Sequence, residues 1–337
     1  MAVSTNKTVV INRKISDAAY DEILPQEQAN GVTFNNQNDL STGILGDGSF
    51  VTDYIVRGFK VGTTQLFFLN DTIYSVSGSA PTVTFYRKYQ LRTNEYFVDV
   101  ASYENTQKAY LLTNQGRLYD STGVLVIDYK TTGTINAYSF TGIIYGAGTS
   151  VYNPCVAVTY LGGVSYNKTG SFTSFQYTQT DEDMYGTIIS MGFLYIFGKE
   201  SHYSLSLATS WTGTKLATES YPTIMGEFKF VQEDIVVGTK GFMVFGLDTL
   251  RAYELVSTHV TTAVKTNAAY GGYLFNNTNK NITYIRFFKD SSKNLNDLET
   301  NYTITSVPKE CFIFLIRYSS YVIGITQDGN VYKIIKG

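Results

Sequence analysis

Short apolar segments alternate with polar turns along most of this chain. Gly192–Lys199 is an apolar run that closes on a glycine, and His202–Leu207 then alternates polar and apolar residues. The same order returns in Asp234–Asp248, where two apolar runs flank Gly238-Thr239-Lys240-Gly241. A hydrophobic strand, a short polar or glycine turn and a second strand are the sequence signal of a β-hairpin. We therefore predict that this part of the chain folds as consecutive hairpins.

The hairpin unit recurs from residue 51 onwards at intervals of 37 to 48 residues. In each copy a large apolar or aromatic residue follows the turn, and these seven markers are Tyr74, Tyr119, Tyr166, Tyr203, Val244, Tyr284 and Tyr332. A four-stranded propeller blade takes about 40–50 residues, so the interval fits one blade per marker. We predict an all-β fold, a β-propeller of seven or alternatively six blades. A β-sandwich or β-solenoid of irregular strands is the competing architecture.

Residues 1–50 do not follow this repeat. Thr8–Asn12 could form a strand, Ser16–Gln28 is acidic and could hold one or two helical turns, and Asn30–Ser49 has the composition of a loop. Gly46-Asp47-Gly48-Ser49 is interpreted as a turn, because it lacks the Gly-x-Ser-x-Gly spacing of a hydrolase nucleophile. We predict a short N-terminal extension over residues 1–50, an arm or docking segment.

Residues 51–337 are predicted to form the propeller domain. Val124–Tyr129 fits an outer strand, and the polar stretch Asp290–Thr300 is predicted to be an insertion loop. The chain ends on a strand, Asn330–Ile335. Because a ring is closed by joining its ends, this strand or the N-terminal one is expected to complete a blade.

Composition agrees with a strand-rich fold and argues against two classes of function. The 337 residues include 28 Tyr and 21 Phe, residue types that favour half-buried strands. Only 16% of residues are charged and the net charge is −2, with no basic block. A dedicated nucleic-acid groove and a patch for anionic membranes both need concentrated Lys and Arg, so this balance argues against them.

The chain shows no secretory or membrane signal. Its first residues lack the apolar core of a signal peptide, and no apolar run approaches the ~20 residues that span a bilayer. Cys155 and Cys311 are too few for a disulfide framework. We expect a protein made in a reducing cytoplasm. The Asn-x-Thr sequences are then a result of abundant Asn and Thr; they lie at Asn6, Asn70, Asn167, Asn276, Asn281 and Asn301.

Residues for catalysis are scarce. His202 and His259 are the only histidines, and neither lies in a pattern that would form a triad. Asp181-Glu182-Asp183 lacks the alternating oxygen ligands of a Ca²⁺ loop and is interpreted as a solvated turn. Trp211 could stack on a sugar or be buried at a blade edge.

Two pairs of carboxylates leave a glycosidase open. These are Asp99 with Glu104, and Glu227 with Asp234. A glycosidase needs two carboxyl groups at a defined separation, which spacing along a strand-rich chain does not reveal. We predict that the protein is not an enzyme, and we assign no catalytic, cofactor-binding or metal-binding residue.

Gly186–Leu255 resembles the central segment of the tail hub proteins of short-tailed bacteriophages, the packaged-DNA stabilisation or tail-nozzle family. The resemblance lies in a strand ending in Phe-Gly with its following strand, Phe193–Leu205, and in the loop Trp211-Thr212-Gly213. An extended stretch to a glycine, Tyr221–Gly226, and the hairpin Val237–Phe245 complete it.

The resemblance implies a structural virion protein, a tail hub or nozzle subunit made in the host cytoplasm. Its partners would be further copies in a homo-oligomeric ring, a hexamer, together with the portal or adaptor ring and tail fibre or needle proteins. Such a ring closes the portal channel, retains the packaged DNA and forms the ejection conduit. Double-stranded DNA would pass through it without sequence-specific binding, and no segment would span a membrane.

Two other classes of function stay open. A carbohydrate- or receptor-binding propeller, such as an adhesin or tail receptor-binding protein, would bind glycans through tyrosines and Trp211. A propeller glycosidase would place two essential carboxylates at one mouth of the ring.

Overall fold

The structure is a computed structural model of the chain. It describes residues 7–14, 21–29, 56–69, 71–77, 82–102, 107–146, 155–180, 182–190, 192–199, 201–208, 217–218, 225–232, 234–245, 250–254, 260–265, 271–276, 281–286, 301–304, 312–318, 321–326 and 331–336. In these residues nearly all regular structure is β-strand, and the helix α2 (Tyr129–Thr132) spans a single turn.

The described strands pair into seven antiparallel sheets, the last of which gains a parallel pairing described below. The first sheet contains β3 (Val56–Val61), β4 (Thr64–Leu69), β5 (Thr72–Ser77) and β6 (Thr82–Lys88). The second contains β7 (Phe97–Ser102), β8 (Ala109–Thr113), β9 (Arg117–Asp120) and β10 (Leu125–Asp128). The third contains β11 (Phe140–Gly146), β12 (Cys155–Tyr160), β13 (Gly163–Asn167) and β14 (Tyr177–Gln179).

The remaining sheets follow the same order along the chain. The fourth contains β15 (Met184–Ser190), β16 (Phe193–Gly198), β17 (His202–Ser206) and β18 (Ala217–Thr218). The fifth contains β19 (Phe228–Gln232), β20 (Ile235–Gly238), β21 (Gly241–Phe245) and β22 (Leu250–Glu254). The sixth contains β23 (Val260–Lys265), β24 (Gly271–Asn276), β25 (Asn281–Arg286) and β26 (Asn301–Ile304). The last contains β27 (Phe312–Tyr318), β28 (Tyr321–Thr326) and β29 (Val331–Lys336), with β1 (Lys7–Lys14) and β2 (Asp21–Ala29) beyond β29.

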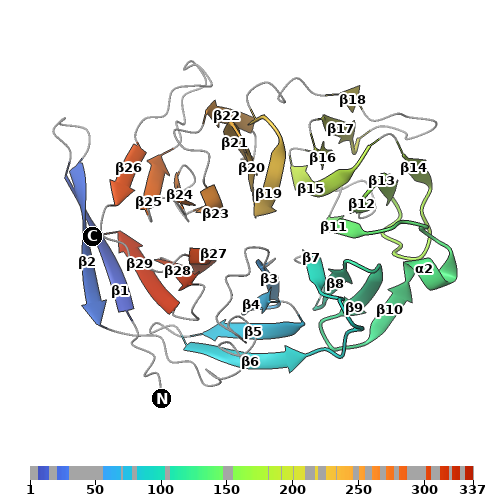
Figure 1. Ribbon diagram of the computed structural model, residues 1–337, viewed down its shortest axis with the longest axis horizontal. Coiled ribbons are helices and arrows are strands. Elements are labelled where there is room, and N and C mark those ends of the chain that lie inside the picture. Colours follow the sequence, from blue (N-terminus) through green and yellow to red (C-terminus); the bar gives the residue numbers. More distant parts are fainter. Residues whose placement is uncertain are drawn as a thin grey trace.

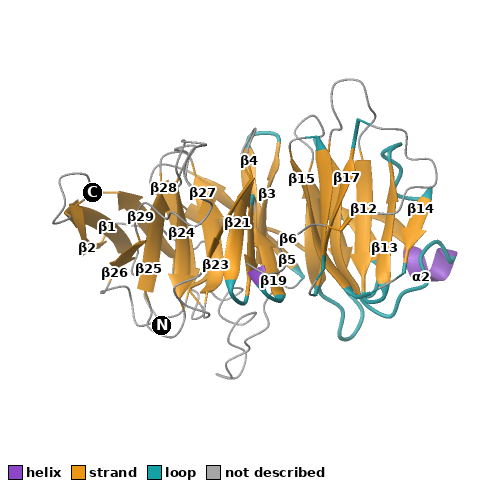
Figure 2. Ribbon diagram, turned by 90° about the horizontal axis from the view of Figure 1, so that it is seen from above, coloured by secondary structure: helices purple, strands orange, loops and turns teal. Residues whose placement is uncertain are grey.

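The sheets stand around a common axis (Figure 1). In each sheet the first strand of the numbered group lies nearest the axis, and neighbouring first strands contact one another from β3 round to β27 and back to β3. Seen from the side, the strands run roughly along the axis (Figure 2). The predicted all-β propeller is confirmed.

The sequence markers share one structural position. Tyr74, Tyr119, Tyr166, Tyr203, Val244, Tyr284 and Tyr332 lie in β5, β9, β13, β17, β21, β25 and β29, which are the third strands of the seven sheets. Each third strand is central in its sheet, with a pairing partner on both sides. Where the structure describes their side chains, the markers are buried or half-buried, which is the environment that favours large apolar and aromatic residues in a strand.

The N-terminal segment differs from the prediction. Its described residues form β1 and β2, which pair antiparallel with each other, and β1 pairs in parallel with β29. The segment was predicted as an arm or docking segment outside the repeat, but these strands belong to the last sheet. The physical reason is closure of the ring. The last sheet contains strands from both ends of the chain, and their pairing joins the two ends. The expectation that a terminal strand would close the ring agrees with the pairing of β1 with β29. The predicted loops Gly46–Ser49 and Asp290–Thr300 lie outside the described residues.

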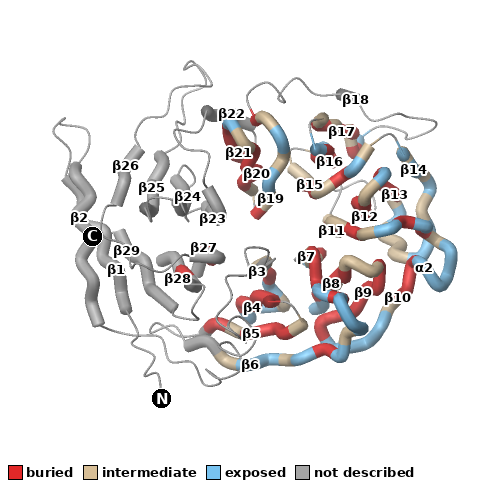
Figure 3. The backbone as a smooth tube through the Cα atoms, in the orientation of Figure 1, coloured by how far each residue is buried: buried red, intermediate tan, exposed pale blue. Residues whose placement is uncertain are grey.

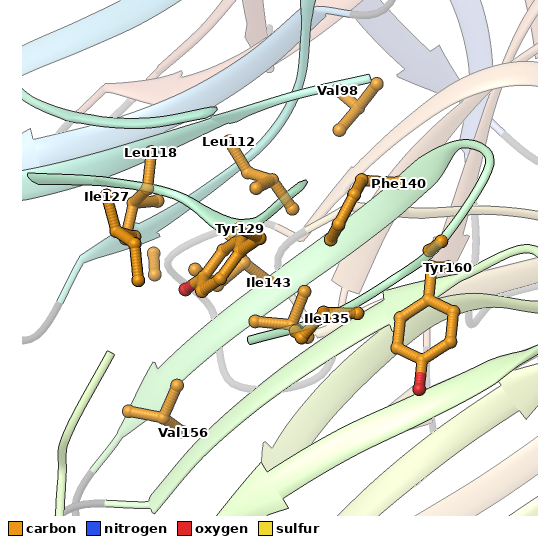
Figure 4. Close-up of a cluster of buried hydrophobic side chains, with 13 residues drawn as sticks. Val98, Leu112, Leu118, Ile127, Tyr129, Ile135, Phe140, Ile143, Val156 and Tyr160 are labelled. Carbon is orange, nitrogen blue, oxygen red and sulfur yellow. The ribbon is translucent and has the colours of Figure 1, made fainter. Parts of the chain in front are cut away.

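Hydrophobic clusters lie between neighbouring sheets from the first to the fifth, and many strand residues of these sheets are buried, red in Figure 3. One cluster joins the second and third sheets and includes Leu112, Tyr129, Phe140 and Val156 (Figure 4). Tyr129 stacks on Phe140 with ring centroids 5.7 Å apart. It starts α2, whose N-terminus is capped by the Asp128 side chain, which accepts from the Thr131 amide. This cap ends β10 one residue before the predicted end of that outer strand.

Candidate functional site

Most of the strands nearest the axis contain a β-bulge. Among the described pairings, every first strand except β3 carries a register shift next to its second strand, for example between Phe97 and Asp99 in β7 and between Phe140 and Gly142 in β11. A bulge bends the strand and re-aims the side chain that follows it. In β7 and β11, residues next to the bulge reach the next first strand: Asp99 contacts Ile143 of β11, and Thr141 contacts Met184 of β15.

Asp99 makes such a link across three sheets. Its carboxylate accepts from the Val100 amide at 2.8 Å and from the Ile143 amide of β11 at 2.9 Å. The Nε of Arg57 in β3 lies 4.0 Å from its Oδ1. Burial raises the pKa of Asp99 despite the guanidinium and the two amides, and burial lowers the pKa of Arg57. The Asp99 carboxylate of β7 thus contacts the first strands of both neighbouring sheets, β3 and β11.

The neighbouring first strands approach closely at Gly142. A Cβ on this residue would lie 2.7 Å from the Thr159 hydroxyl oxygen and 3.3 Å from Asp99 Oδ2. One residue earlier, the Thr141 hydroxyl donates to the Met184 carbonyl of β15 at 2.6 Å. On another part of the ring, Gln232 Nε2 donates to the Leu315 carbonyl and so joins β19 to β27. Side chains therefore tie the first strands together around the axis.

The two predicted carboxylate pairs do not gain support as glycosidase sites. Glu227 is exposed and immediately precedes β19, whereas Asp234 follows the far end of that strand. At about 3.3 Å per residue the two lie about 20 Å apart, beyond the roughly 6.5–9.5 Å of an inverting glycosidase. Glu104, the predicted partner of Asp99, lies outside the described residues, as do His259, Asp181, Cys311 and Trp211.

Charged side chains that are distant in sequence lie near one another at one end of the fourth and fifth sheets. Asp183, Lys199 and Glu227 all act on the Tyr185 hydroxyl, whose pKa is raised first by burial and then by Asp183. Lys199 Nζ lies 3.9 Å from Glu227 Oε1, and both side chains are about half exposed. The hairpin register brings these residues together, and the sequence analysis did not pair them. Among the described residues no group of three His, Cys, Asp or Glu could hold a metal ion.

His202 is a strand residue, as predicted, and the structure shows that it is buried. It is 1% exposed in β17, and its ring meets the Phe197 ring edge-on with centroids 5.2 Å apart. Neither ring nitrogen has a hydrogen-bond partner within the described structure. Burial lowers the pKa of His202 from 6.5 to about 4. The imidazole is therefore neutral at physiological pH.

This burial predicts an acid-sensitive stability. Between pH 6.5 and 4 the unfolded chain binds a proton at His202 that the folded chain excludes, so the free energy of unfolding falls as the pH falls. The full loss is about 3 kcal/mol, and none is expected above pH 7. We expect His202→Phe to remove this component. Urea unfolding of both proteins at pH 7 and pH 4.5 measures the difference, and an equal loss in the two would contradict the assignment.

A buried ion pair fixes the loop between the first and second sheets. Arg117 donates to Glu95 through Nε, at 2.8 Å, and through Nη2. Glu95 also accepts from the Thr113 hydroxyl at 2.6 Å and from the Arg92 amide at 2.8 Å. Burial alone would raise the pKa of Glu95, but these hydrogen bonds outweigh it and the pKa is lowered. The sequence analysis missed this pair, because 22 residues separate its members and no motif marks them.

The outer strands of the first two sheets carry exposed apolar side chains. We call Phe85, Tyr86, Val124 and Leu125 the outer apolar patch; they are 38%, 43%, 58% and 46% exposed. Arg87 of β6 lies close to the turn before β10, because its Nη1 is 2.8 Å from the position that a Cβ on Gly123 would take.

Two further exposed tyrosines lie at one end of the second and third sheets. Tyr138 is 89% exposed and Tyr96 is 40% exposed. The Tyr96 carbonyl accepts from the Asn114 amide at 3.0 Å, and the Asn114 carbonyl accepts from the Phe140 amide at 2.9 Å. These hydrogen bonds place the loop that carries Tyr96 and the loop that carries Tyr138 at the same end of the two sheets. The sequon at Asn167 is not a surface site, because its side chain is buried and donates to the Ser171 and Ser174 carbonyls.

Comparisons with known proteins identify the fold alone. No protein-family model matches the sequence, and no characterised protein matches it significantly. A chain in the structure titled "Crystal Structure of Mitotic Checkpoint Complex" matches 85% of this chain and 90% of its own length, with a TM-score of 0.56 and 10% identity. Hsv2 from Kluyveromyces marxianus matches 82% of this chain and 89% of its own length, with a TM-score of 0.51 and 11% identity. Both are propellers, which agrees with the arrangement of the sheets.

The part of the chain that the structure describes contains no helix long and apolar enough to cross a membrane.

Proposed function

We propose that this chain is a seven-bladed propeller that serves as a structural subunit of a ring, the tail hub or nozzle of a short-tailed bacteriophage. In this proposal each of the seven sheets is one blade. The ring, a hexamer, sits below the portal or adaptor ring and carries tail fibre or needle proteins. It retains the packaged DNA and forms the conduit for ejection, and the chain has no catalytic role.

The outer apolar patch is the observation that supports assembly of the copies into a ring. A propeller is closed on itself, so further assembly must use its outer strands and its loops. A closed ring requires heterologous contacts between neighbouring copies. Exposed Phe85, Tyr86, Val124 and Leu125 offer apolar area that is buried at lower desolvation cost than charged surface. The resemblance of Gly186–Leu255 to tail hub proteins supplies the identity of the ring, and in the structure this segment contributes to two consecutive sheets.

The conduit in this proposal runs between the subunits. Asp99 joins β7 to β11, and Gln232 joins β19 to β27, around the axis of the single propeller. The major groove of B-DNA alone is about 12 Å wide. A duplex therefore needs the wider opening at the centre of a ring of copies.

A receptor-binding propeller is the second candidate. Tyr96 and Tyr138 lie at one end of the ring, and Tyr138 is 89% exposed. Tyrosine rings exposed on one end could stack on a sugar or a receptor side chain. This function predicts that Tyr138→Ala lowers glycan or receptor binding and leaves DNA retention unchanged.

Particles assembled with patch variants test the proposed function. We expect Tyr86→Glu combined with Val124→Glu to prevent the ring from forming and to release packaged DNA, which nuclease sensitivity of the genome measures. Phe193→Glu is the matched control, since Phe193 is 38% exposed and lies outside the patch. Particles that keep their DNA with the double variant, or without the protein altogether, would refute the hub assignment.

A further inference from the structure

We propose that the outer edge of β6 binds an extended, acidic segment of a partner polypeptide, which adds a further strand to the first sheet. The inference rests on the proposed function, because it names the partner that the outer apolar patch would bind. It does not require that the partner be a copy of this chain.

β6 is longer than most other outer strands of the described sheets. β6 is the outermost strand of its sheet, and within the described residues only β5 pairs with it. It has seven residues, whereas the outer strands β10, β14, β18, β22 and β26 have four, three, two, five and four. Short outer strands offer few free backbone groups to another chain.

The other long outer strand is protected. β2 has nine residues and contains Pro25 together with Asp21, Glu22 and Glu27. Proline and charges on an edge strand both disfavour the addition of another strand. β6, with the sequence TVTFYRK, has no proline, and its two charged residues, Arg87 and Lys88, lie together at its C-terminal end. The stretch Thr82–Tyr86 therefore has neither of these protecting features. β6 is thus the edge most suited to strand addition.

The side chains beside this edge provide apolar contacts. The pairing of β5 with β6 shifts between Ile73 and Tyr74, so that Tyr86 is the extra residue of a bulge. Phe85 and Tyr86 are adjacent in sequence and both are exposed. Val124 and Leu125 extend the apolar surface from the next sheet, and Figure 3 shows exposed residues along β6 and at the start of β10. When a strand is added to a sheet edge, backbone hydrogen bonds give affinity and side-chain contacts give specificity.

The charges select an acidic partner. Arg87 Nε is buried and has no hydrogen-bond partner within the described structure. The Lys88 side chain is 67% exposed, and its Nζ lies 3.8 Å from Asp71 Oδ2, a weak contact. Two cations thus end the strand next to the outer apolar patch. Carboxylates on an added strand would complement them, and lysines would be repelled.

Synthetic peptides test the inference on the full-length protein. The probe is a fluorescein-labelled peptide in which valine alternates with glutamate, measured by fluorescence anisotropy. A valine–lysine peptide is expected to bind about tenfold more weakly, which corresponds to 1.4 kcal/mol. The acidic peptide N-methylated at every second residue is expected not to bind, because it lacks the backbone donors along one edge.

Charge reversal supplies the decisive comparison. Arg87→Glu combined with Lys88→Glu is expected to reverse the preference, so that the lysine peptide binds about tenfold more tightly than the acidic one. Lys240→Glu, an exposed lysine of the fifth sheet, is the control and should leave the preference unchanged. Unfolding midpoints of the variants confirm that they fold.

Several outcomes would overturn the inference. These are an unchanged preference in the doubly reversed variant, equal binding of the N-methylated peptide, and self-association through β6 that excludes the peptide. Light scattering of the same samples separates the two proposals. Peptide binding without rings contradicts the hub and supports strand addition, whereas rings without peptide binding support the hub and contradict strand addition.

Discussion

Deletion of residues 1–29 is expected to destabilise the whole propeller. The parallel pairing of β1 with β29 is the contact by which the two ends of the chain close the ring, since every other sheet is built from consecutive strands. Without it the last sheet keeps β27, β28 and β29, and β29 becomes an unprotected edge. We expect a loss of about 5 kcal/mol or more, which is comparable with the entire stability of many domains.

Urea unfolding of the full chain and of the deletion variant measures this loss. A synthetic peptide of residues 1–29 is the matched control, because β1 should pair again when it is supplied separately. We expect the peptide to restore much of the unfolding midpoint, and a peptide of the same composition in scrambled order to restore none. A deletion variant with an unchanged midpoint would show that β1 does not close the ring.

Removal of Glu95 has the second-largest expected effect. Glu95→Ala leaves the guanidinium of Arg117 buried without its carboxylate, and Arg117 is only 11% exposed in its side chain. Breaking one partner of a buried ion pair typically costs about 3–5 kcal/mol. The control is Glu227→Ala, because the Lys199–Glu227 pair is 56% and 50% exposed and should contribute about 0–1 kcal/mol.

Two further measurements distinguish the pair from a general loss of packing. Replacing both residues, as in Glu95→Leu with Arg117→Met, should restore much of the stability, since no unpaired charge remains. The lowered pKa of Glu95 means that its contribution is present above pH 4.5 and is lost as the pH falls through its folded pKa. If the double variant is no more stable than Glu95→Ala, the penalty does not come from the unpaired Arg117.

The repeat could be predicted from the sequence because it is a local pattern. Each marker follows a turn and lies in a third strand, and the markers whose burial the structure describes are buried or half-buried. Residues i and i+2 of a strand lie on the same face of the sheet in any fold. An alternating pattern on both sides of a turn therefore predicts a hairpin from the sequence alone. His202 was also predicted correctly as a strand residue, since its neighbours alternate around it.

The remaining features depend on contacts between segments far apart in the chain. Closure of the ring by a terminal strand was expected, but the pairing of Lys7–Lys14 with Val331–Lys336 was not, because no local signal couples these two strands. The Glu95–Arg117 pair and the outer apolar patch depend on how loops and outer strands of neighbouring sheets meet. Exposure of Phe85 and Tyr86 follows from a bulge whose position the sequence pattern does not give. These features required the structure.

The assembly state tests the central claim most directly. Light scattering of the purified full-length protein, with negative-stain imaging of the same sample, measures whether the copies form a ring. We expect closed rings of about six subunits with an opening at the centre, and we expect Tyr86→Glu with Val124→Glu to yield single propellers. A protein that stays monomeric at every concentration, even with the portal or adaptor ring present, would contradict the proposed function.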